Sequence, residues 1–347
     1  MNRGREDDAR FMQAALREAR KGLGRTLPNP AVGAVVVKNG KILSRGWHRA
    51  AGLPHAEVEA ISKLPSRALS RGATLYVTLE PCSTQGRTPP CTSAIIEAGF
   101  RRVVFGTTDP NPRHAGRAEK ILRTGGIEVT SGVLADECAA LNREWNKWIS
   151  TGRPFVTAKA GMSLDGRIAS PPGRRWITSE AARHDAMKLR ASCGAILVGA
   201  ETVRTDNPKL TIRGIKSSNQ PLRAVWSRTG KLDPDCHLLT DEFRDRTLVY
   251  KGKSLAAVLQ DLGKRGVAHV LIEGGGHTLG EAFDRGLVDR IVFYTAPVLL
   301  GGGVPAVAGR GVGSNETGVE ILEPEYRLVG GCLRTEGLVS RAKRARG

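Results

Sequence analysis

The residues best suited to chemistry lie between His55 and Cys91. A His-Ala-Glu triplet begins at His55, a Pro-Cys pair ends at Cys82, and Cys91 follows after eight further residues. One imidazole and two thiolates bind zinc tightly and leave the fourth tetrahedral position open for water, whose pKa such a metal lowers to about 7. Glu57 would then carry protons, because the Glu of a His-x-Glu motif in zinc deaminases relays protons between water and the leaving amine. The stretch therefore predicts a zinc-dependent deaminase centre.

These residue types also have ordinary structural interpretations. A single His on a helix is more often structural than metal-binding, and a free Cys packs well in a core. The Glu two residues after His55 and the polar Gly-Pro loop between Cys82 and Cys91 favour the metal site instead. We interpret the other cysteines as reduced thiols: Cys138, Cys193, Cys236 and Cys332. We interpret four histidines as structural or surface residues: His114, His184, His237 and His269. We expect Trp145 and Trp148 to pack between the two halves.

The elements that position the zinc ligands alternate between helix and strand. They are a helix capped by Asp7 or Asp8, strands at Ala31–Val37 and Ile42–Trp47, a helix from His55 to about Lys63, a strand at Ala73–Leu79, a helix from Cys91 to Ala98, a strand at Arg102–Gly106, a helix at Arg117–Arg123 and a strand at Ile127–Val133. Asn39-Gly40 is a strong hairpin signal between the first two strands. Cys91 starts a helix, whose positive dipole end favours a thiolate. The alternation predicts a three-layer α/β domain.

The second half has a different composition. A helix from Leu134 to Ser150 and a linker at Thr151–Pro154 separate it from the first, which predicts domains at residues 1–150 and 151–347. The expected strands are Phe155–Gly161, Ala195–Gly199, Leu222–Trp226, Thr247–Tyr250, Val267–Ile272 and Arg290–Tyr294, with helices at Ser179–Ser192 and Ser254–Gly263 and a loop at Arg213–Gln220. The glycines after Glu273 are a weak signal for a phosphate-binding loop before a helix.

Composition limits the class of protein. The chain has 347 residues, enough for two domains, and 40% apolar residues, with no stretch near the roughly 20 that a membrane span needs. The N-terminus has no apolar run after its charges, so we expect no signal peptide, no membrane association and a cytoplasmic location. The net charge is +19, but the basic residues are dispersed except at Arg341–Arg346, and only 5% of residues are aromatic. We therefore expect a surface biased toward phosphate-bearing ligands rather than a nucleic-acid partner.

Several motifs together resemble one family, the bifunctional deaminase/reductase of riboflavin biosynthesis. In the first half they are Pro28–Gly33, His55–Glu57, Leu79–Cys91 and Asp109–Pro112; in the second they are Lys159–Gly166, Trp176–Ser179, Asp206–Pro208 and Glu273–Gly276. Other zinc deaminases of nucleosides and tRNA hold their cysteines as Cys-x-x-Cys, whereas eight residues separate Cys82 from Cys91 here. That insertion is typical of the riboflavin enzymes.

The resemblance implies a cytidine-deaminase-like first domain and a dihydrofolate-reductase-like second domain. The first would deaminate the pyrimidine ring of 2,5-diamino-6-ribosylamino-4(3H)-pyrimidinone 5′-phosphate with one zinc ion per chain. The second would reduce the ribosyl group to ribityl with NADPH, giving 5-amino-6-ribitylamino-uracil 5′-phosphate. The family's reductase domain generally associates through an intersubunit sheet, so the resemblance also implies a homo-oligomer.

The resemblance assigns site residues by position. It implies zinc ligands at His55, Cys82 and Cys91, a catalytic Glu57, and substrate contacts at Asn29, His48, Arg87, Arg190, Leu210, Arg213 and Glu273. It implies cofactor contacts at Gly161, Trp176, Thr202, Asp206, Gly274, Gly275, Gly276, His277, Thr278, Leu279 and Gly280. Lys159 and Asp165 belong to the best-matched motif of the second half, but the resemblance assigns neither residue a step in the reaction.

The chain departs from the family pattern at a few positions. Thr84 stands where a His is usual, Ser227-Arg228 stands where an Asp-Ser pair is common, and Arg174 stands where a Ser is common. Two alternatives therefore stay open. One is a deaminase joined to an inactive reductase-like domain, and the other is a nucleic-acid-editing zinc deaminase, which only the basic charge supports.

Overall fold

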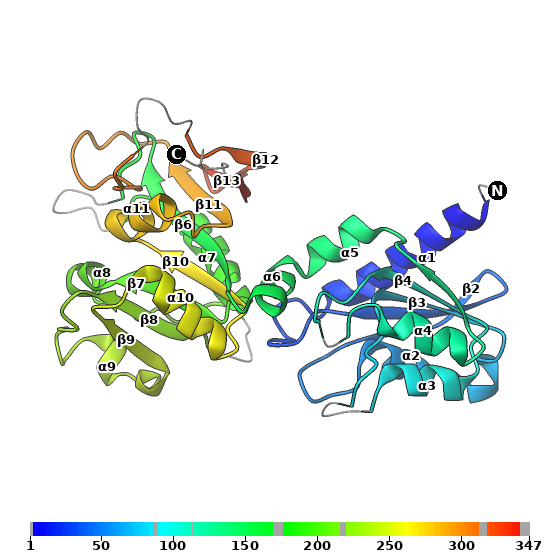
Figure 1. The fold of residues 1–347 in the computed structure, drawn as a ribbon. Coiled ribbons are helices and arrows are strands. Elements are labelled where there is room, and N and C mark those ends of the chain that lie inside the picture. The colour runs from blue at the N-terminus through cyan, green and yellow to red at the C-terminus, as the bar shows by residue number, and fades with distance from the viewer. Residues whose placement is uncertain are drawn as a thin grey trace, which may run out of the picture. The chain divides into compact units, whose positions relative to one another are not determined.

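The computed structural model describes residues 3–85, 89–112, 114–168, 176–215, 220–311 and 318–340. The chain divides into two compact units, Met1–Thr151 and Gly152–Gly347, and each is built on its own sheet (Figure 1). No described helix is long and apolar enough to cross a membrane. Three features named above, Arg87, Arg174 and the basic tail Arg341–Arg346, lie outside the described residues.

The first unit is a three-layer structure around a five-stranded sheet with the order β2-β1-β3-β4-β5 (Figure 1). The strands are β1 (Gly33–Lys38), β2 (Lys41–Trp47), β3 (Thr74–Leu79), β4 (Arg102–Thr107) and β5 (Glu128–Ser131). One face packs on α1 (Arg3–Arg20) and α5 (Ala135–Leu141), and the other on α2 (Ala56–Ser62), α3 (Cys91–Ala98) and α4 (Arg117–Thr124). Alternate strand residues fill the two cores, since Val35 faces α1 and Val36 faces α2.

The strand directions bring two loops to one edge of this sheet. β1 and β2 form the predicted hairpin, in which Asn39 and Gly40 have φ of 51° and 70°, as a type I′ turn requires. β3, β4 and β5 run parallel to one another. The segments that follow Leu79 and Thr107 therefore leave the sheet side by side.

The predicted cap of the first helix is wrong. Helix α1 begins at Arg3, so Asp8 lies within it. The buried Asp8 carboxylate accepts a 2.7 Å hydrogen bond from the Tyr76 hydroxyl and bonds of 2.9 and 2.8 Å from the Arg102 guanidinium. Asp8 therefore ties the helix to β3 and β4 rather than ending it.

The single helix predicted from Leu134 to Ser150 is also wrong, because it divides into α5 and α6 (Arg143–Thr151) at Asn142. The Asn142 side-chain amide pairs with the backbone of Ala31, accepting its N–H at 2.8 Å and donating to its carbonyl at 2.9 Å. Those two bonds fix the segment before β1 and set the direction of α6.

The second unit has an eight-stranded sheet with the order β12-β13-β11-β6-β10-β7-β8-β9. The strands are β6 (Phe155–Ser163), β7 (Ala195–Gly199), β8 (Leu222–Ser227), β9 (Thr247–Lys251), β10 (His269–Glu273), β11 (Arg290–Ala296), β12 (Ile321–Val329) and β13 (Cys332–Val339). The six from β11 to β9 are parallel, and β13 and β12 continue the sheet antiparallel. Parallel strands bring their carboxyl ends to one edge, where ligands bind in open α/β sheets.

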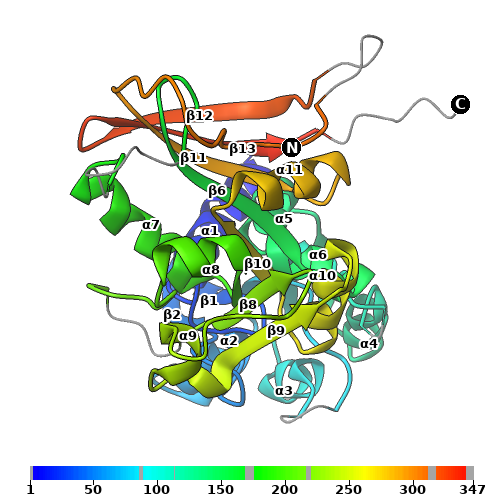
Figure 2. The same ribbon diagram turned by 90° about the vertical axis from the view of Figure 1, so that its left-hand side faces the viewer.

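Helices cover both faces of this sheet. They are α7 (Glu180–Ser192), α8 (Ala200–Asp206), α9 (His237–Thr240), α10 (Leu255–Lys264) and α11 (Gly276–Asp284). Figure 2 shows α7 on one side of β6 and β10 and α10 on the other, in agreement with their separate cores. Ser179 and Ser254 cap α7 and α10 by accepting the N–H of Ala182 and Ala257, so both predicted helices begin where expected.

Four elements were not predicted: α8, α9, β12 and β13. Strand β12 contains Pro324, a register shift between Leu322 and Glu325, and a run of exposed residues. Proline is tolerated at a sheet edge, where its missing N–H does not break a ladder. An edge strand of this composition lacks the apolar alternation from which strands are predicted.

Candidate active sites

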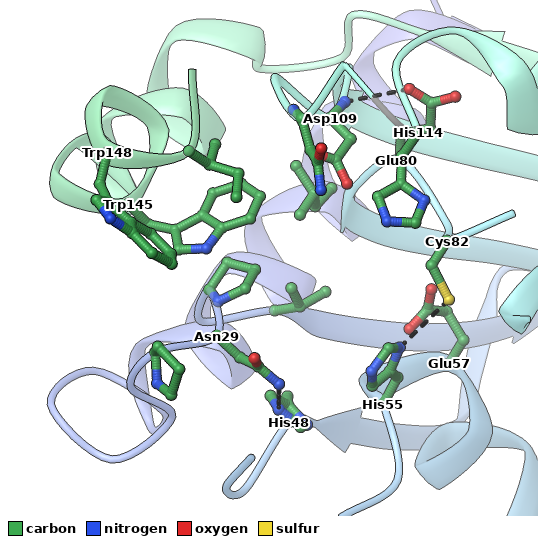
Figure 3. A pocket seen from close by; sticks show the side chains of 16 residues that line it. Asn29, His48, His55, Glu57, Glu80, Cys82, Asp109, His114, Trp145 and Trp148 are labelled. Atoms are coloured by element: carbon green, nitrogen blue, oxygen red, sulfur yellow. Dashed lines mark hydrogen bonds between the residues drawn. The ribbon is translucent and has the colours of Figure 1, made fainter. Parts of the chain in front are cut away.

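The predicted zinc ligands come together in the first unit. His55 is the N-cap of α2, Cys91 is the first residue of α3, and Cys82 lies just after β3. His55 Nδ1 lies 3.2 Å from Cys91 Sγ and 3.5 Å from Cys82 Sγ, and all three atoms lie within 4.8 Å of one another. Figure 3 shows the His55 ring facing the Cys82 sulfur. Three separate elements thus direct their ligand atoms at one point.

A zinc ion fits this set of donors. Zinc bonds of about 2.0–2.1 Å to nitrogen and 2.3 Å to sulfur, at a tetrahedral angle, place nitrogen and sulfur about 3.5 Å apart, close to the separations above. The Cys91 backbone N–H also donates to Cys82 Sγ at 3.3 Å. Hydrogen bonds from Cys91 and His55 lower the pKa of the Cys82 thiol. The hydrogen bond between the two sulfur atoms raises the pKa of Cys91, and burial raises it further. The protein by itself therefore stabilises one thiolate at this point.

Glu57 lies beside the ligands, in the first turn of α2. Its side chain is buried and lines the same cavity as His55 and Cys82 (Figure 3). Burial raises the pKa of Glu57, because a carboxylate loses hydration in the interior. A carboxyl group in this place can take up and release a proton, as general acid-base chemistry requires.

These residues form one wall of a cavity of about 270 Å³. Its apolar lining consists of Pro28, Pro30, Val32, Leu79, Trp145, Trp148 and Ile149. Its polar lining, besides His55, Glu57 and Cys82, consists of Asn29, His48, Glu80, Asp109, Asn111 and His114. Apolar walls combined with polar groups that converge on one space are typical of small-molecule sites.

Asn29 and His48, both expected in the pyrimidine pocket, lie against each other in this cavity (Figure 3). His48 Nδ1 lies 3.1 Å from the carbonyl oxygen of Pro54, and His48 Nε2 lies 3.0 Å from Asn29 Nδ2. Nδ1 must carry the proton to donate to a carbonyl, so neutral His48 accepts the Asn29 N–H at Nε2. Burial lowers the pKa of His48, which favours that neutral form. Asn29 is thereby held with its oxygen available as an acceptor.

The sequence interpretation missed the wall formed by Glu80 and the segment Asp109–His114. It treated His114 as structural or surface and Trp145 and Trp148 as packing residues, yet all three line the cavity. The Asp109–Pro112 motif was noted only for its resemblance to the family. Its position directly after β4, beside the strand that leads to Cys82, was the signal that could have placed it at the site.

Glu80 holds this wall in place. Its buried carboxylate accepts the backbone N–H groups of Asp109, Gly116 and Ala118 at 3.1, 3.0 and 2.9 Å. We expect Glu80→Ala to lower the free energy of unfolding by about 2–4 kcal/mol, because three buried donors lose their acceptor, and to reduce deamination at 25 °C at least tenfold. Chemical denaturation and ammonia release would measure the two effects. An unchanged midpoint would contradict this role, and Glu97→Ala, at an exposed position of α3, is the control.

In the second unit a buried ion pair occupies the carboxyl end of β10. Arg190, from α7, donates from Nε and Nη2 to the two oxygens of Glu273 at 2.6 and 2.8 Å, and from Nη1 to the Thr211 carbonyl at 2.8 Å. Lys159 lies opposite Glu273 in the parallel register, with Nζ 3.8 Å from Oε2. Glu273 thus pairs with two cations that lie far from it in the sequence.

Acidification should destabilise this unit through Glu273. Burial alone would raise the pKa of Glu273, but the charges of Arg190 and Lys159 outweigh it and lower the pKa to about 2. A folded-state pKa below the unfolded value of about 4.3 gives stability that is present above pH 4.3 and is lost as the pH falls toward 2, on the order of 3 kcal/mol. Thermal unfolding between pH 6 and pH 3 should show the loss. In Glu273→Gln this part of the pH dependence should vanish.

The residues expected to bind the cofactor gather at the same edge of the sheet. Gly274 and Gly275 follow β10 with φ of 77° and 75°, and a Cβ built on Gly275 would lie 3.1 Å from Thr202 Oγ1 and 3.3 Å from Thr278 Oγ1. A Cβ on Gly161, in β6, would lie 3.1 Å from Thr178 Cγ2. Glycine is favoured at Gly274 and Gly275 because their φ is positive, and at Gly161 because the Thr178 side chain is close.

The rest of the expected cofactor loop has other contacts. A Cβ on Gly276 or Gly280 would overlap the backbone at Pro305 or Ala308, and Leu279 is buried in the core. His277 is exposed and lines a second cavity with Trp226, Glu281, Asp284 and Arg310. Within the stretch Gly274–Gly280, the glycine pair at its start and the Thr278 hydroxyl, which lies next to Gly199 at the end of β7, therefore lie toward the edge of the sheet.

The remaining expected residues are more exposed, except Leu210. Trp176 is 52% exposed, and the Arg183 guanidinium lies over its ring at 4.7 Å. Asp206 and Arg213 are exposed at the end of α8 and in the following loop. Leu210 is buried with a left-handed φ of 49°, a costly conformation for a non-glycine residue.

Asp165 has a structural explanation. Its carboxylate accepts the Ser163 hydroxyl at 2.6 Å and the N–H groups of Leu300 and Gly301 at 3.0 and 2.8 Å. These bonds, that of Ser163 foremost, lower the pKa of Asp165 to about 2. Asp165 therefore fixes the loop after β11 to the end of β6.

Comparisons with known proteins match both units of the chain. A family model described as the RibD C-terminal domain matches residues 154–332, and one described as the zinc-binding region of cytidine and deoxycytidylate deaminases matches residues 5–107. The riboflavin biosynthesis protein RibD of Aquifex aeolicus is 39% identical, covering 94% of this chain and 97% of its own. The chain belongs to the RibD family.

Solved structures from the family have the same fold throughout. RibD of Acinetobacter baumannii covers 97% of this chain and 100% of its own, with 34% identity and a TM-score of 0.89. A Thermotoga maritima structure described as a diaminohydroxyphosphoribosylaminopyrimidine deaminase/5-amino-6-(5-phosphoribosylamino)uracil reductase covers the same shares, with 34% identity and a TM-score of 0.85. The predicted family, the cytidine-deaminase-like and dihydrofolate-reductase-like fold class and the bifunctional enzyme class are confirmed. Zinc and NADPH are the cofactors of this RibD-family enzyme.

The departures from the RibD pattern have structural contexts. Thr84 Oγ1 lies 3.2 Å from the Nδ1 atom of His114, so an imidazole from another loop lies next to the position where a His is usual. Ser227 is buried and its hydroxyl accepts the N–H of Gly230 at 2.9 Å, closing a turn. Arg228 is exposed.

Proposed function

We propose that this chain performs two consecutive reactions of riboflavin biosynthesis in the cytoplasm. Residues 1–150 hydrolytically deaminate the pyrimidine ring of 2,5-diamino-6-ribosylamino-4(3H)-pyrimidinone 5′-phosphate. Residues 151–347 then reduce the ribosyl group to ribityl with NADPH, giving 5-amino-6-ribitylamino-uracil 5′-phosphate. The observation that carries the proposal is the convergence of His55, Cys82, Cys91 and Glu57 on one cavity, in a chain of this family.

In the deamination, His55, Cys82 and Cys91 hold zinc, which when bound activates a water molecule for attack on the amine-bearing carbon. Glu57 accepts one proton from the water on its carboxylate and delivers it to the ring nitrogen. It then takes the second proton from the hydroxyl group added to the ring carbon and delivers it to the departing amine. Ammonia leaves and a carbonyl group remains on the ring.

Asn29 and the apolar walls of the cavity orient the ring. Because His48 accepts one of its N–H groups, Asn29 presents its carbonyl oxygen to an N–H group of the pyrimidine. Trp145, Trp148 and Leu79 enclose the ring and exclude bulk water, which strengthens the polar contacts inside the cavity.

In the reduction, NADPH supplies the hydride, and the protein holds both ligands at the carboxyl edge of the second sheet. The cofactor contacts are Gly161, Trp176, Thr202, Asp206 and the loop Gly274–Gly280, in which the left-handed Gly274 and Gly275 let the backbone approach a phosphate. The substrate contacts are Arg190, Leu210, Arg213 and Glu273. Arg190 and Glu273 are already fixed to each other, so the substrate meets an ordered polar surface.

The test is an assay of the purified chain with the diaminopyrimidinone phosphate, with and without NADPH. We expect ammonia release in both cases, and formation of the ribityl product with oxidation of NADPH only when the cofactor is present. Deamination without any NADPH oxidation would mean an inactive reductase-like half. Neither reaction on this substrate, with deamination of single-stranded nucleic acid, would replace the proposal with the editing alternative.

The edge of the second sheet supports a homo-oligomer. Tyr326 and Leu328 on β12 are 64% and 75% exposed, and Leu333, paired with Leu328, is 38% exposed. An exposed apolar face on an edge strand is suited to pairing with another chain. We expect Leu328→Glu to lower the assembly mass in analytical ultracentrifugation. Sedimentation of the unchanged chain as a monomer would contradict the proposal.

A further inference from the structure

We infer that His114 is a specificity-determining contact to the ribosyl phosphate part of the deaminase substrate, and that Thr84 orients it. The inference rests on the proposed function, because it concerns the substrate of that site. Three observations support it: the hydrogen bonds that hold the loop around His114, the hydrogen bonds of the histidines that line the cavity, and the difference in burial between the cavity walls.

The backbone around His114 is firmly positioned. Glu80 binds the N–H groups of Asp109, Gly116 and Ala118, on both sides of His114. The His114 N–H itself donates to the Asn111 carbonyl at 2.9 Å. A side chain in such a segment has a defined direction, and Figure 3 shows the His114 ring on the wall next to Cys82.

Three histidines line the cavity, and their nitrogen atoms differ in availability. His48 uses Nδ1 for the Pro54 carbonyl and Nε2 for Asn29. The Nδ1 atom of His55 contacts the sulfur atoms of Cys82 and Cys91. His114 uses Nδ1 for Thr84, and among the described residues its Nε2 has no hydrogen-bond partner. His114 can therefore offer its Nε2 atom to a ligand in the cavity.

The Thr84 hydroxyl lies 3.2 Å from His114 Nδ1, and we infer that it donates to this nitrogen. When that hydroxyl donates to Nδ1, neutral His114 carries its proton on Nε2 and becomes a donor. Phosphate and sugar oxygens are acceptors, and they match such a donor. Thr84 is thus a positioning residue, which acts on the substrate through the imidazole.

Burial distinguishes which part of the substrate His114 meets. Glu57 and His48 are 3% and 2% exposed, and the proton transfers proposed for Glu57 place the reacting ring carbon beside that deep wall. His114 is only partly buried and is followed by exposed Ala115 and Gly116, so it stands at the mouth of the cavity. A ring placed deep in the cavity sends its ribosyl phosphate toward the mouth.

The test compares steady-state deamination by the unchanged chain, His114→Phe, His114→Gln, Thr84→Val and the double variant His114→Phe/Thr84→Val. We expect His114→Phe to raise KM about tenfold with kcat changed less than twofold, as loss of one hydrogen bond in uniform binding predicts. Thr84→Val should raise KM less, His114→Gln should recover part of the affinity, and Thr84→Val should add nothing when His114 is already Phe.

A ring-only competitive inhibitor, 2,5,6-triamino-4-pyrimidinone, identifies the contacted group. Its inhibition constant should be unchanged in His114→Phe, because it lacks the ribosyl phosphate. An unchanged KM, additive effects of the two substitutions, or an equal loss of inhibitor affinity would each overturn the inference. Zinc content and NADPH-dependent reduction in the same preparations verify folding. If the unchanged chain releases no ammonia from the substrate, it is the proposed function that fails.

Discussion

Replacement of Glu57 by glutamine is expected to abolish ammonia release while leaving bound zinc unchanged. Glutamine has the same volume as glutamate, so the buried position in α2 stays filled. It cannot accept a proton from water or pass one to the ring nitrogen and the amine. General acid-base catalysis contributes about 10²–10⁴-fold per step, and Glu57 serves more than one proton transfer. We therefore expect kcat to fall at least about a thousandfold, as measured by ammonia release with metal analysis of the same protein.

The control for this variant is Glu59→Gln, two residues further along the same helix. Glu59 is also buried, but its carboxylate pairs with Arg49 and Lys63 and does not line the cavity. Its change should cost some stability and leave deamination within a few fold. Turnover by Glu57→Gln at more than a tenth of the unchanged rate would show that another group carries the protons.

Removal of the Arg190 guanidinium is expected to destabilise the second unit strongly. In Arg190→Leu the Glu273 carboxylate stays buried and loses both of its short hydrogen bonds, while Lys159 Nζ stays 3.8 Å away. Breaking a buried pair by removing one partner costs about 3–5 kcal/mol. Thermal inactivation of NADPH oxidation should therefore begin several degrees lower. Reductase activity below that temperature should fall too, because Arg190 is a proposed substrate contact.

Arg204→Leu is the matched control. Arg204 and Glu201 both lie on α8 and form an ion pair at 2.6 Å, but their side chains are 49% and 75% exposed. A pair of this kind contributes about 0–1 kcal/mol. Ammonia release provides a second reference, because its residues lie in the other unit. Equal inactivation temperatures for Arg190→Leu and Arg204→Leu would contradict the assigned role of the buried pair.

The zinc ligands and Glu57 could be predicted from sequence because their chemistry depends on local motifs. His55 and Glu57 are two residues apart on one helix, and Cys82 and Cys91 flank one loop. Glu80 could not be found in this way, since its role consists of bonds to backbone N–H groups, which every residue type offers. The position of His114 on the cavity wall could not be predicted, because its contact with Thr84 joins loops after two different strands.

The same distinction holds for the fold. The Asn39-Gly40 turn and the starts of α7 and α10 at Ser179 and Ser254 depend on local sequence, and they were predicted correctly. Asp8 resembles a cap in sequence, but its contacts with Tyr76 and Arg102 come from distant strands. Asn142 breaks a helix because it binds the backbone of Ala31, more than a hundred residues earlier. Long-range polar contacts of this kind override local propensity.

The most direct test of the zinc deaminase centre is metal analysis of the purified chain beside its Cys82→Ala variant, with ammonia release measured on both. Cys82 supplies one of three converging ligand atoms, so two protein ligands would remain in the variant. We predict one zinc ion per unchanged chain, and loss of most of the metal and nearly all deamination in Cys82→Ala. Stoichiometric zinc with full deamination in that variant would contradict the assignment of the centre to His55, Cys82 and Cys91.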